Sequence, residues 1–117
     1  MAKNLSDPLT ALVRKHGDYP CEAYEFIFTA LEFSIKTIGK KRHISGQELL
    51  EGIKQCARDQ FGLMALVVFH HWGVYKTDDF GEIVFRLVDA GLLGKTEHDF
   101  REDFNDGYDF EKTFRSG

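Results

Sequence analysis

Residues 43–93 contain the start and end signals of three consecutive helices, and this stretch constrains the fold more than any other. Ser45 precedes Glu48 by three residues. This is the spacing of a capping box, in which each side chain accepts the backbone amide of the other residue. The pattern predicts a helix over about residues 46–60 that ends before Gly62. Its expected apolar face comprises Leu49, Leu50, Ile53, Cys56 and Ala57.

Two further helices are expected after Gly62. Residues 63–69 are apolar without interruption, which predicts a short helix buried on all sides, with a strand as the alternative. Residues 77–93 have a clearer helical period, and Thr77 or Asp79 can cap their start. The apolar stripe comprises Phe80, Ile83, Val84, Leu87, Val88 and Gly91. The expected solvent-facing ion pairs are Glu82–Arg86 and Arg86–Asp89.

The order helix, short buried helix, turn and helix is typical of a winged helix-turn-helix, whose third helix enters the DNA major groove ahead of a β-hairpin wing. We therefore expect a mostly α, compact single domain of about five helices over residues 1–117, with a winged-helix-like central three-helix unit at 44–93. Charge disfavours DNA binding, because Lys and Arg supply most affinity for phosphate. The third helix exposes several acidic residues, and residues 96–111 contain seven acidic side chains and one arginine.

Residues 21–38 are the most hydrophobic element of the chain, with a single polar stripe of Glu25, Thr29, Glu32 and Lys36. So wide an apolar face predicts a central helix or, as the alternative, a helix covered by a second subunit in a homo-oligomer. A strand ending near Ile38 is a further alternative. Before this element, Asp7 and Pro8 predict the start of a short amphipathic helix that ends near Gly17.

Composition points to an ordinary globular protein of 117 residues with a net charge of −4. The longest apolar run is too short to cross a bilayer, and the first residues lack the apolar core of a signal peptide. Cys21 and Cys56 are far apart in the sequence and are expected to be reduced thiols. We therefore expect a cytoplasmic protein without membrane association.

Three consecutive basic residues, Lys40, Lys41 and Arg42, are the candidate contact for an acidic partner. A solvated loop is the simpler interpretation of this cluster. As an alternative function, the cluster could serve a nucleic-acid- or ribosome-associated factor.

No motif predicts catalysis or a bound cofactor. His70 and His71 are adjacent, so on a helix they point about 100° apart and do not share one metal ion simply. We expect no metal site, and a metal or small-ligand binder around His70, His71 and Trp72 is the second alternative function. Asp79-Phe80-Gly81 matches the kinase metal-binding triplet in letters alone, and residues 103–107 do not have the spacing of a calcium loop.

The segment after Leu93 is both acidic and aromatic. Thr96 and Asp99 have capping-box-like spacing, and residues 105–107 carry a turn signal. The pattern predicts irregular short helices, with a hairpin-like wing as the alternative. We expect residues 94–117 to pack on the core, and also consider them as a docking surface for a protein partner. The candidate interaction surface comprises His71, Trp72, Arg101, Asp103, Tyr108 and Phe110.

Six sequence blocks can be considered together: HISGQELLEGI (43–53), QFG (60–62), HWGV (71–74), DFGEIVF (79–85), REDF (101–104) and GYDF (107–110). On these blocks the chain resembles a family of short bacterial proteins of unknown function, over about residues 24–114. The resemblance implies a bacterial cytoplasmic protein whose acidic tail belongs to the domain, and it carries no activity or partner. Taken together, the sequence predicts a protein-interaction or regulatory module without catalytic activity.

Overall fold

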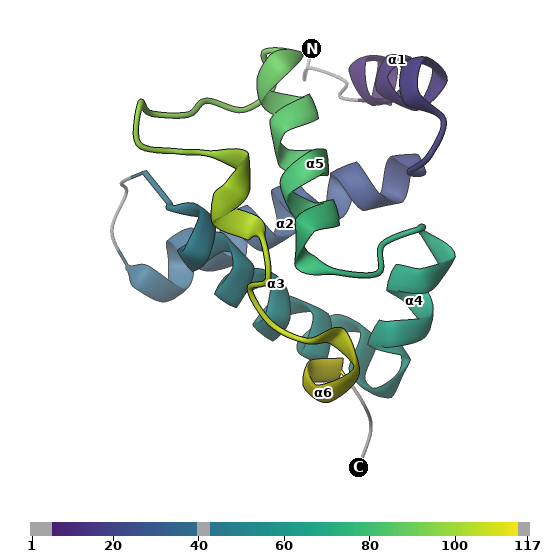
Figure 1. The fold of residues 1–117 in the computed structure, drawn as a ribbon, viewed down its shortest axis with the longest axis vertical. Coiled ribbons are helices and arrows are strands. Elements are labelled where there is room, and N and C mark those ends of the chain that lie inside the picture. The colour runs from purple at the N-terminus through teal and green to yellow at the C-terminus, as the bar shows by residue number, and fades with distance from the viewer. Residues whose placement is uncertain (1–5, 40–42, 115–117) are drawn as a thin grey trace.

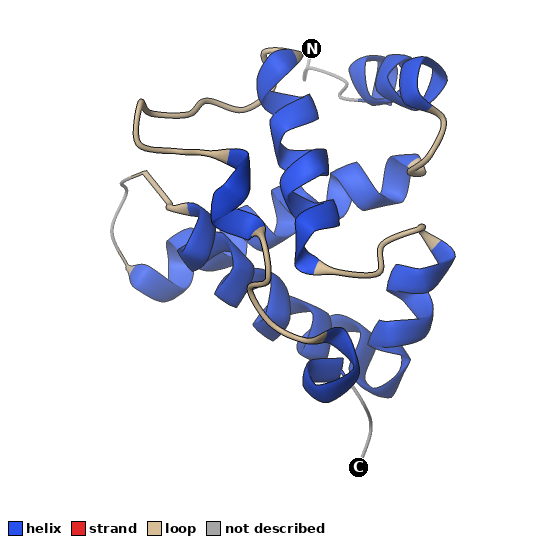
Figure 2. Ribbon diagram, in the orientation of Figure 1, coloured by secondary structure: helices blue, strands red, loops and turns tan. Residues whose placement is uncertain are grey.

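The computed structural model describes residues 6–39 and 43–114, and this part of the chain consists of helices joined by loops and turns, without a strand (Figure 2). The expected mostly α single domain is confirmed. The elements are α1 (Ser6–His16), α2 (Cys21–Ile38), α3 (Gly46–Phe61), the 3-10 helix η1 (Gly62–Met64), α4 (Ala65–His71), α5 (Thr77–Asp89), the 3-10 helix η2 (Arg101–Phe104) and α6 (Phe110–Phe114).

The capping box predicted from the sequence forms at the start of α3. The Glu48 amide donates to Ser45 Oγ at 3.1 Å, and the Ser45 amide donates to Glu48 Oε1 at 3.0 Å. α3 ends at Phe61, and Gly62 follows with a φ of 52°, a value that favours glycine. Because the cap and the stop are both local interactions, the sequence predicted this helix to within one residue.

α2 is the central helix, and its bounds are those predicted. It packs against α3 and α5, which cross it in Figure 1. Tyr24, Ile27 and Ala30 are fully buried, while the polar stripe that begins at Glu25 is exposed. The strand alternative is therefore wrong, and most of the broad apolar face of α2 is buried within the domain.

The apolar run at residues 63–69 is not buried on all sides, so this prediction is wrong. Leu63, Met64 and Val67 are 74%, 55% and 56% exposed, and within the run Ala65 and Phe69 are the buried residues. The reason is tertiary: α4 packs mainly on α3 and α6, and its buried residue Phe69 also contacts Phe26 of α2 and Phe80 of α5. The outer side of α4 has no neighbour in the described part of the chain.

α5 is followed by short helices instead of a hairpin. Asp79 caps its start, because the carboxylate accepts the amides of Tyr75 at 2.8 Å and Lys76 at 3.3 Å. Thr77 is buried and accepts the Gly107 amide at 2.9 Å, so it fastens the C-terminal segment instead of capping. Residues 94–114 contain η2 and α6, which makes the hairpin alternative wrong. The central helix order is present, but the described residues form no wing.

The C-terminal aromatic side chains pack into the core and exclude a hairpin. Phe104, Phe110 and Phe114 are at most 5% exposed. The Phe69 ring contacts two of them, with centroid distances of 5.6 Å to Phe110 and 5.2 Å to Phe114, and it also contacts Trp72 at 5.7 Å. Ring pairs at these distances add to the free energy gained from burial. The described aromatic residues of this segment therefore pack on the core.

Arg86 is at the centre of a polar network, although the sequence predicted it on a solvent-facing side. Its side chain is 10% exposed and forms a bidentate ion pair with Asp18, with N–O distances of 2.6 and 2.9 Å. It also binds Glu82 at 3.1 Å, as predicted, and the Tyr24 hydroxyl at 3.3 Å. Asp18 thus replaces the expected partner Asp89. The network fastens the α1–α2 connection to α2 and α5.

Close backbone approach explains the glycine of the Asp-Phe-Gly triplet. η2 packs on α5 and on the start of α3. A Cβ atom added to Gly81 would lie 2.9 Å from Phe104 Cβ and 3.1 Å from the Arg101 carbonyl oxygen. The triplet therefore has a packing role, because η2 reaches α5 at a position where a side chain does not fit.

We expect Gly81→Ala to lower the free energy of unfolding by about 2 kcal/mol, because overpacking displaces η2. Gly94→Ala is the matched control, since a Cβ atom at Gly94 meets no atom within 4 Å. Urea denaturation followed by circular dichroism measures both effects. Equal stability of the two variants would contradict the packing of η2 described here.

Candidate functional site

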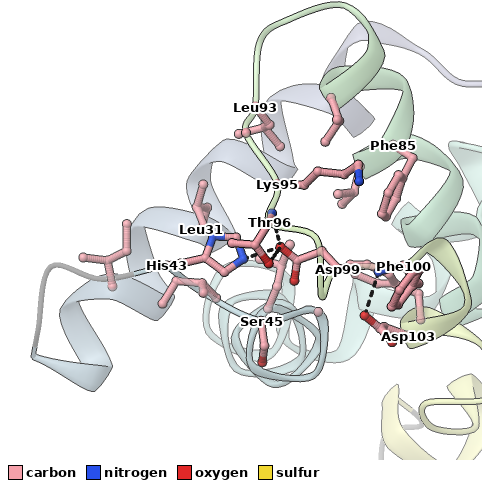
Figure 3. Close-up of a pocket in the computed structure, with 18 residues that line it drawn as sticks. Leu31, His43, Ser45, Phe85, Leu93, Lys95, Thr96, Asp99, Phe100 and Asp103 are labelled. Carbon is pink, nitrogen blue, oxygen red and sulfur yellow. Dashed lines mark hydrogen bonds and ion pairs between the residues drawn. The ribbon is translucent and has the colours of Figure 1, made fainter.

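A pocket of about 400 Å³ opens between the α2, α3 and α5 helices and the 93–104 segment (Figure 3). We call it the 43–104 pocket. Its apolar walls come from four parts of the chain: Leu31 and Ile35 of α2, Leu49 of α3, Val84, Phe85 and Val88 of α5, and Leu93 and Phe100 of the loop. Phe100 is 56% exposed and forms the outer edge. Mostly apolar concave surfaces with a few polar groups are typical of small-ligand sites.

The polar end of the pocket is organised around Asp99 (Figure 3). Its Oδ2 atom accepts the Thr96 amide at 2.7 Å and the Thr96 hydroxyl at 3.0 Å, and it pairs with His43 Nε2 at 2.5 Å. The capping-box-like spacing of Thr96 and Asp99 thus forms a turn in which each residue donates its amide to the other. The Asp99 amide donates to the Thr96 carbonyl at 3.2 Å. The turn does not continue into an α-helix.

These donors hold Asp99 in its ionised form. Burial by itself raises the pKa of Asp99, but hydrogen bonds from the Thr96 amide and hydroxyl, together with His43, outweigh it and lower the pKa below its ordinary value. Asp99 therefore remains a carboxylate at neutral pH, and its oxygen is used to fix the loop.

Lys95 is the pocket-lining cation that stands apart from this network. In Figure 3 its side chain extends from the loop toward Phe85. Among the residues that the structure describes, Lys95 forms no hydrogen bond or ion pair, and its side chain is exposed. By contrast, Asp103 at the same pocket accepts the Phe100 amide at 3.0 Å. The pocket thus combines apolar walls, two hydrogen-bonded carboxylates and one unpaired ammonium group.

A second feature is the apolar surface of η1 and α4, which we call the α4 patch: Leu63, Met64, Val67 and His71. The helical period places Leu63, Val67 and His71 one turn apart on the same side. His71 is exposed, as the predicted interaction surface requires. None of the four residues lines the 43–104 pocket.

The other predicted surface residues have different environments. Trp72 and Phe110 are 9% and 5% exposed and belong to the core, so neither can be part of a contact surface as the fold stands. Their aromatic character predicted an interface, whereas the small core uses it for packing. Tyr108 is half-buried, and its hydroxyl donates to the Leu50 carbonyl at 2.9 Å. Burial raises the pKa of Tyr108. Arg101 is exposed and lies 3.3 Å from Glu82, while Asp103 is half-buried.

The candidate basic contact Lys40, Lys41 and Arg42 lies outside the described residues. The histidines of the second alternative, His70 and His71, are exposed, and the His70 ring packs on Tyr75 at a centroid distance of 5.0 Å. Across residues 6–39 and 43–114, no three His, Cys, Asp or Glu side chains form a group that could hold a metal ion.

The two cysteines are poor nucleophiles. Burial, and then a 3.3 Å hydrogen bond to Glu25, raise the pKa of Cys21 to about 11. Burial also raises the pKa of Cys56. Both thiols therefore stay protonated at neutral pH, and the thiolate is the reactive form.

The 43–104 pocket was missed in the sequence, although the Thr96–Asp99 turn that borders it was recognised. Its walls come from segments distant in the sequence, and every wall residue has the pattern of an ordinary core residue. The sequence signal nearest to the site was the local spacing of Thr96 and Asp99.

Comparisons of the chain with protein-family models, with curated proteins and with solved structures found no match. The fold and the site therefore define the class of protein directly: a small, mostly α domain whose described residues form an apolar pocket and an exposed apolar patch. No helix of the described ranges is both long enough and apolar enough to cross a membrane.

Proposed function

We propose that the protein is a cytoplasmic protein-interaction module that binds another protein through the α4 patch and has no catalytic activity of its own. The observation that carries the proposal is the exposure of three large apolar side chains, Leu63, Met64 and Val67, within five consecutive residues. Exposed apolar groups gathered in one place mark interaction sites, whereas single exposed apolar residues are common.

The chemistry of the patch favours the apolar face of an amphipathic helix as the partner surface. Such a helix presents residues at the same one-turn spacing as Leu63, Val67 and His71. Met64 adds a flexible side chain that adapts to a partner surface. The low reactivity of both thiols and the structural use of Ser45 as a helix cap support a binding role over catalysis.

Affinity capture from a native lysate, followed by mass spectrometry, tests the proposal. We expect one protein partner to be retained by the wild type and lost with Val67→Asp, because the substitution places a charge in the apolar contact. Phe100→Asp is the matched control, since Val67 and Phe100 are both 56% exposed and belong to different surfaces. Circular dichroism confirms that both variants fold.

Nuclease treatment separates this function from the alternative of a nucleic-acid-associated factor. A partner that resists nuclease and depends on Val67 supports the interaction module. Capture that is equal for Val67→Asp and the wild type would refute the role of the α4 patch. Capture that disappears with nuclease would favour the nucleic-acid alternative.

A further inference from the structure

The apolar walls of the 43–104 pocket retain surface that a ligand could cover. Leu31, Ile35, Phe85, Val88 and Leu93 pack against the core but remain half-buried, and all of them line the pocket. Removing such surface from water is favourable in proportion to its area. A volume of about 400 Å³ lies within the range of small-molecule sites.

The charged side chains at the pocket determine which charge the polar group of that ligand should carry. Asp99 is already contacted by three donors, and Asp103 accepts the Phe100 amide. Lys95, in contrast, has no partner within residues 6–39 and 43–114. A ligand anion can pair with this ammonium group without displacing a protein hydrogen bond. A ligand cation would instead compete with the donors that already surround Asp99.

From this arrangement we infer that the 43–104 pocket binds a small monocarboxylate with an apolar body, whose carboxylate pairs with Lys95. The body lies against the α2 and α5 walls, and the carboxylate remains at the solvent-facing end. This site shares no residue with the α4 patch, so it is a binding activity independent of the proposed interaction with a protein.

The loop that carries Lys95 is fixed before a ligand arrives. Two reciprocal turns hold it: Thr96 with Asp99, and Phe100 with Asp103, in which the Asp103 amide donates to the Phe100 carbonyl at 3.0 Å. The His43–Asp99 pair then ties the loop to the segment before α3. Binding therefore costs little ordering of the loop, and preorganisation of this kind raises affinity.

Titration of the ¹⁵N-labelled full chain with octanoate tests the inference, and octanol, which has the same chain and no charge, is the ligand control. We expect octanoate at up to millimolar concentration to shift the amide signals of pocket residues. Lys95→Gln should weaken octanoate binding about fivefold, the upper range for an exposed ion pair, and should leave octanol binding unchanged. Lys95 is exposed, so this substitution does not threaten the fold.

Two further variants identify the location of binding. Val88→Phe should weaken the shifts by narrowing the pocket, whereas Val67→Asp in the α4 patch should leave them unchanged. The inference is overturned if octanoate produces no shifts, if Lys95→Gln binds octanoate as tightly as the wild type, or if Val67→Asp abolishes binding. Because none of these readouts requires a protein partner, failure here is distinguishable from failure of the proposed function.

Discussion

Gly52→Ala is expected to lower the free energy of unfolding by about 3 kcal/mol, at the upper end of the usual cost of overpacking. Gly52 lies in α3, where the helix packs against α2. A Cβ atom at this position would overlap the Ser34 hydroxyl oxygen and would lie 3.1 Å from Ser34 Cβ and 3.3 Å from the Ala30 carbonyl oxygen. Rotation of the hydroxyl alone does not remove the contacts with the other two atoms. Urea denaturation measures the change.

The sign of the change in the free energy of unfolding is informative, because helix propensity alone predicts that Gly52→Ala stabilises the protein. Alanine in a helix interior is about 1 kcal/mol more favourable than glycine. A Gly52→Ala variant more stable than the wild type would therefore show that α2 and α3 are not as close as described.

Ser34→Ala provides the control for the mechanism. Alone, it should cost about 1 kcal/mol, because the buried Ser34 hydroxyl donates to the Ala30 carbonyl at 2.9 Å. Combined with Gly52→Ala it removes the overlapping oxygen, so the double variant should be more stable than the sum of the single changes predicts. Additive effects would contradict a direct clash between the two residues.

Arg86→Met is expected to lower the free energy of unfolding by about 2 kcal/mol. This value lies between those of exposed and buried ion pairs, because Arg86 is 10% exposed while its partner Asp18 is 52% exposed. The substitution removes the hydrogen bonds to Asp18, Glu82 and Tyr24, and also the stacking of the guanidinium carbon 5.0 Å from the centre of the Tyr19 ring. Thermal and urea denaturation measure the loss.

Arg101→Met is the matched control for Arg86. Arg101 is 49% exposed and makes an ion pair of 3.3 Å with Glu82, so its removal should cost less than about 1 kcal/mol. Arg86→Lys should recover part of the stability of the wild type, because a lysine cannot form the bidentate pair. Equal decreases in the free energy of unfolding for Arg86→Met and Arg101→Met would contradict the central position of Arg86 in the polar network.

The cost of Arg86→Met should also depend on pH. The hydrogen bond from Arg86 holds the pKa of Asp18 below its ordinary value. A carboxyl group with a lowered pKa contributes stability above its unfolded pKa of about 4, and the contribution is lost as the pH falls through the folded value. The free energy of unfolding of the wild type should therefore approach that of Arg86→Met as the pH falls into the acid range. If the two free energies of unfolding differed by the same amount at neutral and acid pH, the result would contradict the pairing with Asp18.

Local interactions explain which features the sequence predicted well. The bounds of α2 follow from hydrophobic periodicity, and the capping box of α3 follows from hydrogen bonds between residues at most four apart. Both can therefore be predicted from the sequence alone. The turn between Thr96 and Asp99 belongs to the same group. The burial of Phe110 did not follow from the sequence, because a small core and a protein interface both favour large aromatic side chains.

Tertiary structure decided the features that depend on neighbours distant in the sequence. The apolar run containing Leu63 and Val67 became a surface because the described elements cover one side of α4. Arg86 became half-buried because Asp18, 68 residues away, lies opposite it. The 43–104 pocket exists because four segments surround it without filling it. Gly52 is required by the close approach of two helices, which reverses the sign that its local propensity predicts. In each case the deciding interaction joins residues that are far apart in the sequence, and no sequence pattern shows that they are close in space.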